Sequence, residues 1–147
     1  MEITKVYDAN AESFFNILRN SFKADYQSNT KTFIKADDIQ PGLKYKKQFG
    51  QAGKSTALVE VEAMKFPLHY KVKLGSNRGS NIIEYVIEPQ SDDTISVTYR
   101  EDYVDEGLFM KMNNKVLYPF FRKKFEKRMT DQVDSLIRHS KVRKEQA

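Results

Sequence analysis

Residues 108–138 read LFMKMNNKVLYPFFRKKFEKRMTDQVDSLIR, a segment too long and too evenly patterned for a strand. Its apolar residues recur at steps of three and four, which places them on one face of a helix: Leu117, Phe121, Phe125, Met129, Val133, Leu136 and Ile137. A helix with one apolar stripe needs a sheet or another helix to cover that stripe. We therefore expect a long C-terminal helix over about 108–139, with a kink or a new start at Pro119.

The preceding segment, residues 43–104, has the period of two that is typical of strands. Apolar and polar residues alternate over five runs, separated by turn residues: 43–49, 55–65, 68–74, 82–88 and 95–103. Turns at intervals of roughly ten residues predict an antiparallel meander joined by hairpins.

The N-terminal part predicts a strand followed by a helix. Residues 2–7 alternate, and Asn10 is a candidate N-cap. The helix should present one apolar face and end near its last member: Phe14, Ile17, Leu18 and Phe22. Residues 23–30 could form a second short helical piece, and residues 32–34 a short strand.

These elements predict an α+β fold, in which a curved antiparallel sheet of about six or seven strands wraps around the C-terminal helix. One or two short helices follow the first strand. A chain of 147 residues is long enough to bury a core, so we expect one domain over residues 1–147, with a charged tail at 140–147.

Composition limits the classes of function. The chain has no cysteine, which excludes disulfides, thiolate catalysis and cysteine zinc sites, and it fits a reducing compartment. No apolar run approaches the roughly 20 residues that span a bilayer, and the N-terminus has no basic-then-apolar leader. We expect a cytoplasmic protein.

The net charge of +5 is concentrated at the C-terminal end. From Phe120 onward nine basic residues face four acidic ones, a difference equal to the whole net charge. A solvated helix face explains this pattern. The alternative is a surface for an acidic protein partner or, less in keeping with the pattern, nucleic acid, formed by Arg122, Lys123, Lys127 and Arg128.

Three passages resemble the START-like superfamily, also called polyketide cyclase-like or SRPBCC: residues 3–15, Leu43-Lys44-Tyr45 after Pro41-Gly42, and residues 120–137. Together with Val97-Thr98-Tyr99-Arg100-Glu101, the passage at Pro41 is similar to a group of small bacterial proteins of unknown function in that superfamily. The resemblance implies a helix-grip fold and a cavity between sheet and helix that holds a small apolar molecule. It implies no catalytic residue.

Strand alternation gives the candidate ligand-binding residues. On one face of the predicted strands, several tyrosines lie beside a carboxylate. These residues and two phenylalanines of the predicted C-terminal helix form the candidate set: Tyr45, Tyr70, Tyr85, Tyr99, Glu101, Phe121 and Phe125. Tyr103 has the same parity. Tyrosine is also common at the rim of sheets, where its hydroxyl lies in water, so the pattern leaves both interpretations open.

Glu101 permits two interpretations. A carboxylate on a mostly apolar face could act as a general acid or base in a cyclase-like enzyme, or it could form an ion pair near the strand end. An enzyme is the less favoured class.

Other sequence motifs argue against nucleotide binding and metal binding. Gly50-Gln51-Ala52-Gly53-Lys54-Ser55-Thr56 has only two residues between its glycines and precedes a strand, so it is not a phosphate-binding loop. His69 and His139 lie on different elements and have no metal-ligand spacing. We expect no metal and no cofactor, and the sequence does not set the oligomeric state.

Overall fold

The computed structural model describes residues 2–49, 55–76, 79–104, 127, 130–131 and 133–138. Its elements, in chain order, are β1 (Glu2–Tyr7), α1 (Ala11–Thr30), the 3-10 turn η1 (Ala36–Asp38), β2 (Lys44–Phe49), β3 (Ser55–Lys65), β4 (His69–Ser76), β5 (Gly79–Ser91) and β6 (Thr94–Val104). No helix in this described part has the length and hydropathy to span a bilayer.

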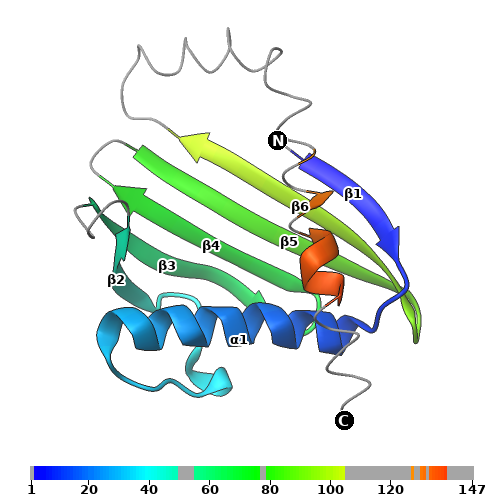
Figure 1. Ribbon diagram of the computed structural model, residues 1–147, viewed down its shortest axis with the longest axis horizontal. Coiled ribbons are helices and arrows are strands. Elements are labelled where there is room, and N and C mark those ends of the chain that lie inside the picture. The colour runs from blue at the N-terminus through cyan, green and yellow to red at the C-terminus, as the bar shows by residue number, and fades with distance from the viewer. Residues whose placement is uncertain are drawn as a thin grey trace, which may run out of the picture.

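The six strands form one antiparallel sheet in the order β1-β6-β5-β4-β3-β2. Strands β2 to β6 are the predicted meander, and β1 pairs with β6 so that Ile3 lies opposite Tyr99. The sheet curves (Figure 1). The register of the strand pairs shifts at Val61/Ala63 and at Pro89/Ser91, and such interruptions of the ladder accompany local twist and bend of a strand. The predicted α+β class with a curved antiparallel sheet is confirmed.

Helix α1 lies against one end of the inner face of the sheet (Figure 1). Asn10 caps it as predicted, because its side-chain oxygen accepts from the Ser13 amide at 3.1 Å. The face formed by Phe14, Phe15, Leu18 and Phe22 is buried. This face and the inner-face residues of the strands make up the core.

The expected end of α1 near Phe22 is wrong: the helix continues without a break to Thr30. Contacts with the sheet stabilise the added turns, because Asp25 binds Tyr45 and Lys47, and the Asn29 side chain accepts from the Gln48 amide at 3.0 Å. The helix ends at Lys31, which has φ 61° and donates its amide to the Gln27 carbonyl. Residues 32–34 do not form a strand.

Most of the predicted C-terminal helix lies outside the described residues, and its full length stays a prediction. Residues 133–138 are helical. Val133 and Ile137 of the expected apolar stripe are buried in the core, and Leu136 packs against it.

Candidate functional site

Three tyrosines line up across the centre of the inner face. Tyr70, Tyr85 and Tyr99 are neighbours on β4, β5 and β6, with ring centroids 5.8 and 4.8 Å apart. Helix α1 covers Tyr70 and Tyr85, since the Phe14 ring lies 6.1 Å from Tyr85 and the Phe15 ring lies 6.3 Å from Tyr70. All three tyrosines are buried, and burial raises the pKa of the Tyr70 hydroxyl well above its ordinary value. These rings form a packed floor rather than a rim.

Tyr45 lies on β2 and extends this floor toward the edge of the sheet. Its ring packs against Phe22 and Tyr26 of α1, at 5.6 and 5.1 Å. Its hydroxyl donates to one oxygen of Asp25, and Lys47 Nζ lies 2.9 Å from the other. Burial, and then the hydrogen bond to Asp25, raise the pKa of Tyr45. This cluster fastens the edge strand to the helix.

Glu101 also faces inward, as the alternation of β6 predicts. Its Oε2 accepts a hydrogen bond from the Tyr99 hydroxyl at 3.0 Å, and its Oε1 lies 3.4 Å from Asn81 Nδ2. Ile83 is its cross-strand neighbour, and Leu74 is the neighbour of Asn81. Tyr99 and Asn81 therefore each donate to one oxygen of this carboxylate, and the side chains opposite Glu101 and Asn81 on the neighbouring strands are apolar.

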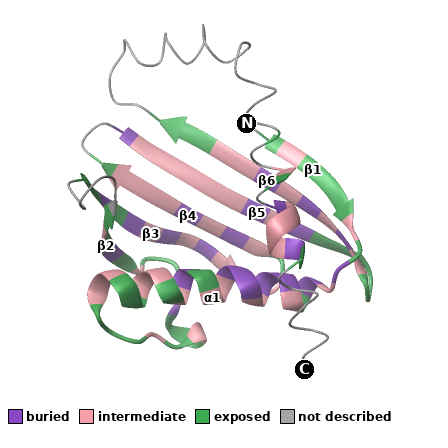
Figure 2. Cartoon of the chain, viewed as in Figure 1, coloured by how far each residue is buried: buried purple, intermediate pink, exposed green. Residues whose placement is uncertain are grey.

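The inner face changes from closed to open along the strands (Figure 2). On β6 the exposed fraction rises from 1% at Tyr99, through half-buried Glu101, to 43% at Tyr103. On β4 Tyr70 and Val72 are buried, whereas Leu74 is half-buried. The open part is the end of the sheet away from α1.

A hollow of about 1210 Å³ lies at this open end. Its described lining comes from residues of both faces of the sheet. The inner-face part is lined by Lys47, Ala57, Leu74, Asn81 and Tyr103. Asn81 of this part hydrogen-bonds Glu101.

On the other side of the inner face, the C-terminal helical residues are attached to β1. Asp134 hydrogen-bonds Tyr7, and Lys5 Nζ lies 3.9 Å from Asp134 Oδ1. Burial, and then the hydrogen bond to Asp134, raise the pKa of Tyr7. The stripe residues Val133 and Ile137 therefore lie over the same face as the tyrosine floor.

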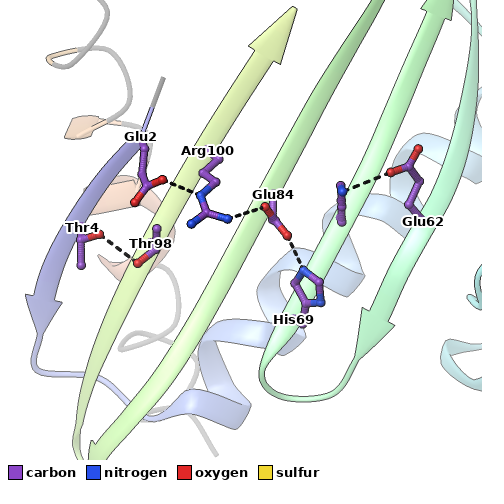
Figure 3. A network of polar contacts seen from close by, with 8 residues as sticks. Glu2, Thr4, Glu62, His69, Glu84, Thr98 and Arg100 are labelled. Carbon is purple, nitrogen blue, oxygen red and sulfur yellow. Dashed lines mark hydrogen bonds and ion pairs between the residues drawn. The ribbon is translucent and has the colours of Figure 1, made fainter.

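The outer face of the sheet carries a row of ion pairs that crosses the strands (Figure 3). Arg100 lies 2.6 Å from Glu2 and 3.3 Å from Glu84, and His69 Nε2 lies 2.5 Å from the second oxygen of Glu84. Burial acts to raise the pKa of Glu84, but the hydrogen bonds from His69 and Arg100 outweigh it and hold the pKa below its ordinary value.

The same face holds a second ion pair, in which Lys71 Nζ lies 3.5 Å from Glu62 Oε2. His69 thus faces away from the tyrosine floor and contacts Glu84. In the described part of the chain, no group of three or more His, Cys, Asp or Glu residues is placed to hold a metal ion.

The structure brings five of the seven candidate residues to the inner face: Tyr45, Tyr70, Tyr85, Tyr99 and Glu101. Phe121 and Phe125 lie outside the described residues, as do Arg122, Lys123 and Arg128 of the basic face. Sequence reasoning missed Asn81, although it stands two residues before Ile83 in the alternation and so has the inward parity.

Comparisons with known proteins give a family and a fold. The family model described as "Domain of unknown function (DUF3284)" matches residues 1–122. No curated protein matches the sequence.

Solved structures are similar over almost the whole chain. A protein of unknown function from Staphylococcus aureus has a TM-score of 0.60 and 18% identity, over 97% of this chain and 94% of that one. A START superfamily protein from Mycobacterium smegmatis has a TM-score of 0.58 and 15% identity, over 92% and 97%. Norcoclaurine synthase from Thalictrum flavum has a TM-score of 0.57 and 10% identity, over 93% and 84%. At these identities the likeness concerns the fold, and the predicted START-like resemblance is confirmed.

Proposed function

We propose that this chain, which belongs to the DUF3284 family, binds a small apolar molecule on the inner face of its sheet, at the open end beside Glu101. The observation that carries the proposal is the change in exposure along the inner face. This face is fully packed at Tyr99, whereas Tyr103 is 43% exposed. The carboxylate of Glu101, which the Tyr99 hydroxyl positions, lies between the two tyrosines, and apolar side chains lie beside it. Pockets for small molecules commonly combine an apolar lining with a few fixed polar groups.

In this proposal the tyrosines have different roles. Tyr70 and Tyr85 are covered by α1 and form the rigid floor, and Tyr45 fixes the edge of that floor through Asp25. Tyr99 presents its hydroxyl to Glu101. The ligand would contact the residues beyond the floor, which are Leu74, Asn81, Ile83, Glu101 and Tyr103.

The C-terminal helix would supply the opposite wall. Phe121 and Phe125 share the predicted stripe with Val133 and Ile137, and those two pack on the inner face. A helix rises 1.5 Å per residue, so Phe121 would stand roughly 18 Å from Val133 along the axis. On this proposal the two phenylalanines would lie beyond the closed core, and residues 1–147 would form one domain.

Two leucines on opposite faces allow a matched test. Leu74 lines the inner-face part of the hollow, and Leu58 lines its outer-face part, on the exposed side of the neighbouring strand. We expect the neutral fluorescent probe N-phenyl-1-naphthylamine to bind the wild-type chain and Leu58→Arg, and to bind Leu74→Arg at least about tenfold more weakly. A bulky charge at the exposed Tyr103, in Tyr103→Arg, should have a similar effect with less risk to folding.

Each variant is first checked for an unchanged unfolding midpoint. Native mass spectrometry of the purified protein, followed by solvent extraction, would identify any molecule that it carries. The proposal is overturned if the wild-type chain does not bind the probe, or if both inner-face variants bind it as tightly as Leu58→Arg.

A further inference from the structure

We propose that the border strand β2 binds an extended acidic segment of another protein, which pairs with β2 as an added strand. This interaction surface is separate from the proposed ligand site, since it uses the border and the outer face of the sheet rather than the inner face. In the described part of the chain, β2 is the last strand of the sheet order and pairs with β3 alone (Figure 1). A border strand can be extended in this way by a peptide from another molecule.

The backbone of β2 turns alternate residues toward β3 and away from it. The Val61 amide of β3 donates to the Leu43 carbonyl at 2.9 Å, just before β2 begins. Along an antiparallel ladder, residue pairs that exchange hydrogen bonds alternate with pairs that do not. Tyr45, two residues after Leu43, therefore bonds to β3, whereas the amides and carbonyls of Lys44 and Lys46 point away from the sheet.

These outward backbone groups are occupied at one end of β2. Gln48 has the same direction as Lys46, and its amide bonds the Asn29 side chain of α1 at 3.0 Å. Within the described residues, no hydrogen bond reaches the outward amides and carbonyls of Lys44 and Lys46. Those groups can bond a short extended segment that ends before it reaches Asn29.

The charges on this border indicate an acidic partner. Lys44 and Lys46 are exposed on the outer face, and neither forms an ion pair within the described residues. Glu60 of β3 lies opposite Lys44, but it also lies opposite Lys73 of β4, so one acid is shared between two lysines. The outer face beside the border is therefore positive, and acidic side chains of a partner strand would balance it.

Strand pairing specifies where the acids of the partner must lie. Every strand pair of the described sheet is antiparallel, and an antiparallel partner would place two residues directly opposite Lys44 and Lys46. Those two residues would turn their amides toward β2 and their side chains toward the outer face. We therefore expect acids at alternate positions of the partner. Because the pairing uses backbone amides, the partner is a peptide segment rather than nucleic acid.

A labelled seven-residue peptide in which valine alternates with glutamate tests the inference by fluorescence anisotropy at low salt, where charges are least screened. We expect it to bind, and the same peptide with lysine in place of glutamate to bind at least about tenfold more weakly. N-methylation of the glutamates removes the amides that would pair and keeps the charge, so it should weaken binding about tenfold or more. On binding, amide exchange followed by NMR should slow at Lys44 and Lys46 and stay unchanged at Tyr45.

A charge reversal on the border has a matched control elsewhere on the sheet. Lys46→Glu places like charge against the peptide and should weaken binding about fivefold or more. Lys65→Glu changes the net charge equally, at an exposed lysine on the far end of β3, and should keep the affinity within about twofold. An unchanged unfolding midpoint is checked first for both variants.

Three outcomes would overturn the inference. The first is that the acidic peptide does not bind the wild-type chain. The second is that the N-methylated peptide binds as tightly as its parent, because charge alone would then explain the binding. The third is that Lys46→Glu binds the peptide as tightly as Lys65→Glu. None of these measurements uses the inner-face probe, so the proposed ligand site can fail or hold independently.

Discussion

The two faces of the sheet differ in what joins neighbouring strands, because ion pairs cross the outer face and packed aromatic rings cross the inner face. The outer face lines up acids and bases across neighbouring strands, so that Glu2, Arg100, Glu84 and His69 form one continuous row. The inner face packs Tyr70, Tyr85 and Tyr99 into one aromatic layer, and Glu101 accepts a hydrogen bond from the Tyr99 hydroxyl. Because successive residues of one strand point to opposite faces, both arrangements come from the same stretches of sequence.

Stability and ligand binding depend on different parts of the two faces. The outer pairs are partly exposed to water, and exposed ion pairs contribute little to stability. The aromatic layer is buried and contributes most of it. We therefore expect the free energy of unfolding to depend mainly on the inner-face residues near α1. Ligand binding should depend on the inner-face residues at the open end.

The largest effect is expected from Phe15→Ala. Phe15 is 0% exposed and packs against Phe66 and Tyr70, so its removal leaves a cavity and should lower the free energy of unfolding by about 3–5 kcal/mol. Urea unfolding measures this change. Phe33→Ala is the control, since Phe33 is 82% exposed and should change stability by about 0.5 kcal/mol or less. Similar losses in the two variants would contradict the contrast between buried and exposed rings.

Alkaline pH should unfold the inner face. The pKa of Tyr70 is raised in the folded chain, so above about pH 10 the unfolded chain loses this proton first and stability falls as pH rises. Tyr70→Phe should reduce that fall by up to about 1.4 kcal/mol per pH unit, the limit for one proton. Unfolding at pH values from 9 to 11.5 measures the slope. An unchanged slope in Tyr70→Phe would show that this hydroxyl does not carry the effect.

Acidic pH should instead lower stability through the outer face. The pKa of Glu84 lies below its ordinary value of about 4.5 in the folded chain, so its contribution is present above that pH and is lost as pH falls through the lowered pKa. Glu84→Gln should lower stability at pH 7 by about 1 kcal/mol or less and flatten the decline below pH 4.5. Thermal unfolding from pH 3 to 7 checks both parts. A variant that keeps the wild-type acid decline would exclude Glu84 as its source.

The smallest effect is expected at the contact of Thr4 with Thr98. Their hydroxyls lie 2.9 Å apart on the exposed outer face, where water replaces a lost hydrogen bond. Thr98→Val keeps the β-branched shape and should change stability by about 0.5 kcal/mol or less. A loss several times larger in urea unfolding would show that the outer face contributes more than its exposure suggests.

Local patterns predicted the strands and their faces well. Alternation places Tyr99 and Glu101 on the inner face, because the period of two is a property of each strand alone. The end of α1 could not be found in this way, since Asp25 and Asn29 stabilise the last turns through β2. The apolar pattern typical of a helix weakens after Phe22, and contacts with the sheet stabilise the helix beyond that point.

The partners of each side chain were harder to predict than its face. Asn81 meets Glu101 because β5 and β6 pair with Tyr103 opposite Asn81, and a hairpin sequence does not specify that register. The outer row of ion pairs depends on the registers of β1, β4, β5 and β6 together. The amino-acid composition shows only that the chain has enough acidic and basic residues to form such pairs.

The hydrogen bond from the Gln48 amide to Asn29 has a consequence for self-association. A strand at the border of a sheet offers unpaired amides that can recruit a strand from another molecule and start aggregation. On β2 the Asn29 side chain already occupies one such amide, and the exposed Lys44 and Lys46 surround the strand with positive charge. An incoming copy would have to displace the asparagine and bring its own lysines against these, so the border opposes fibril-like growth without needing another element to cover it.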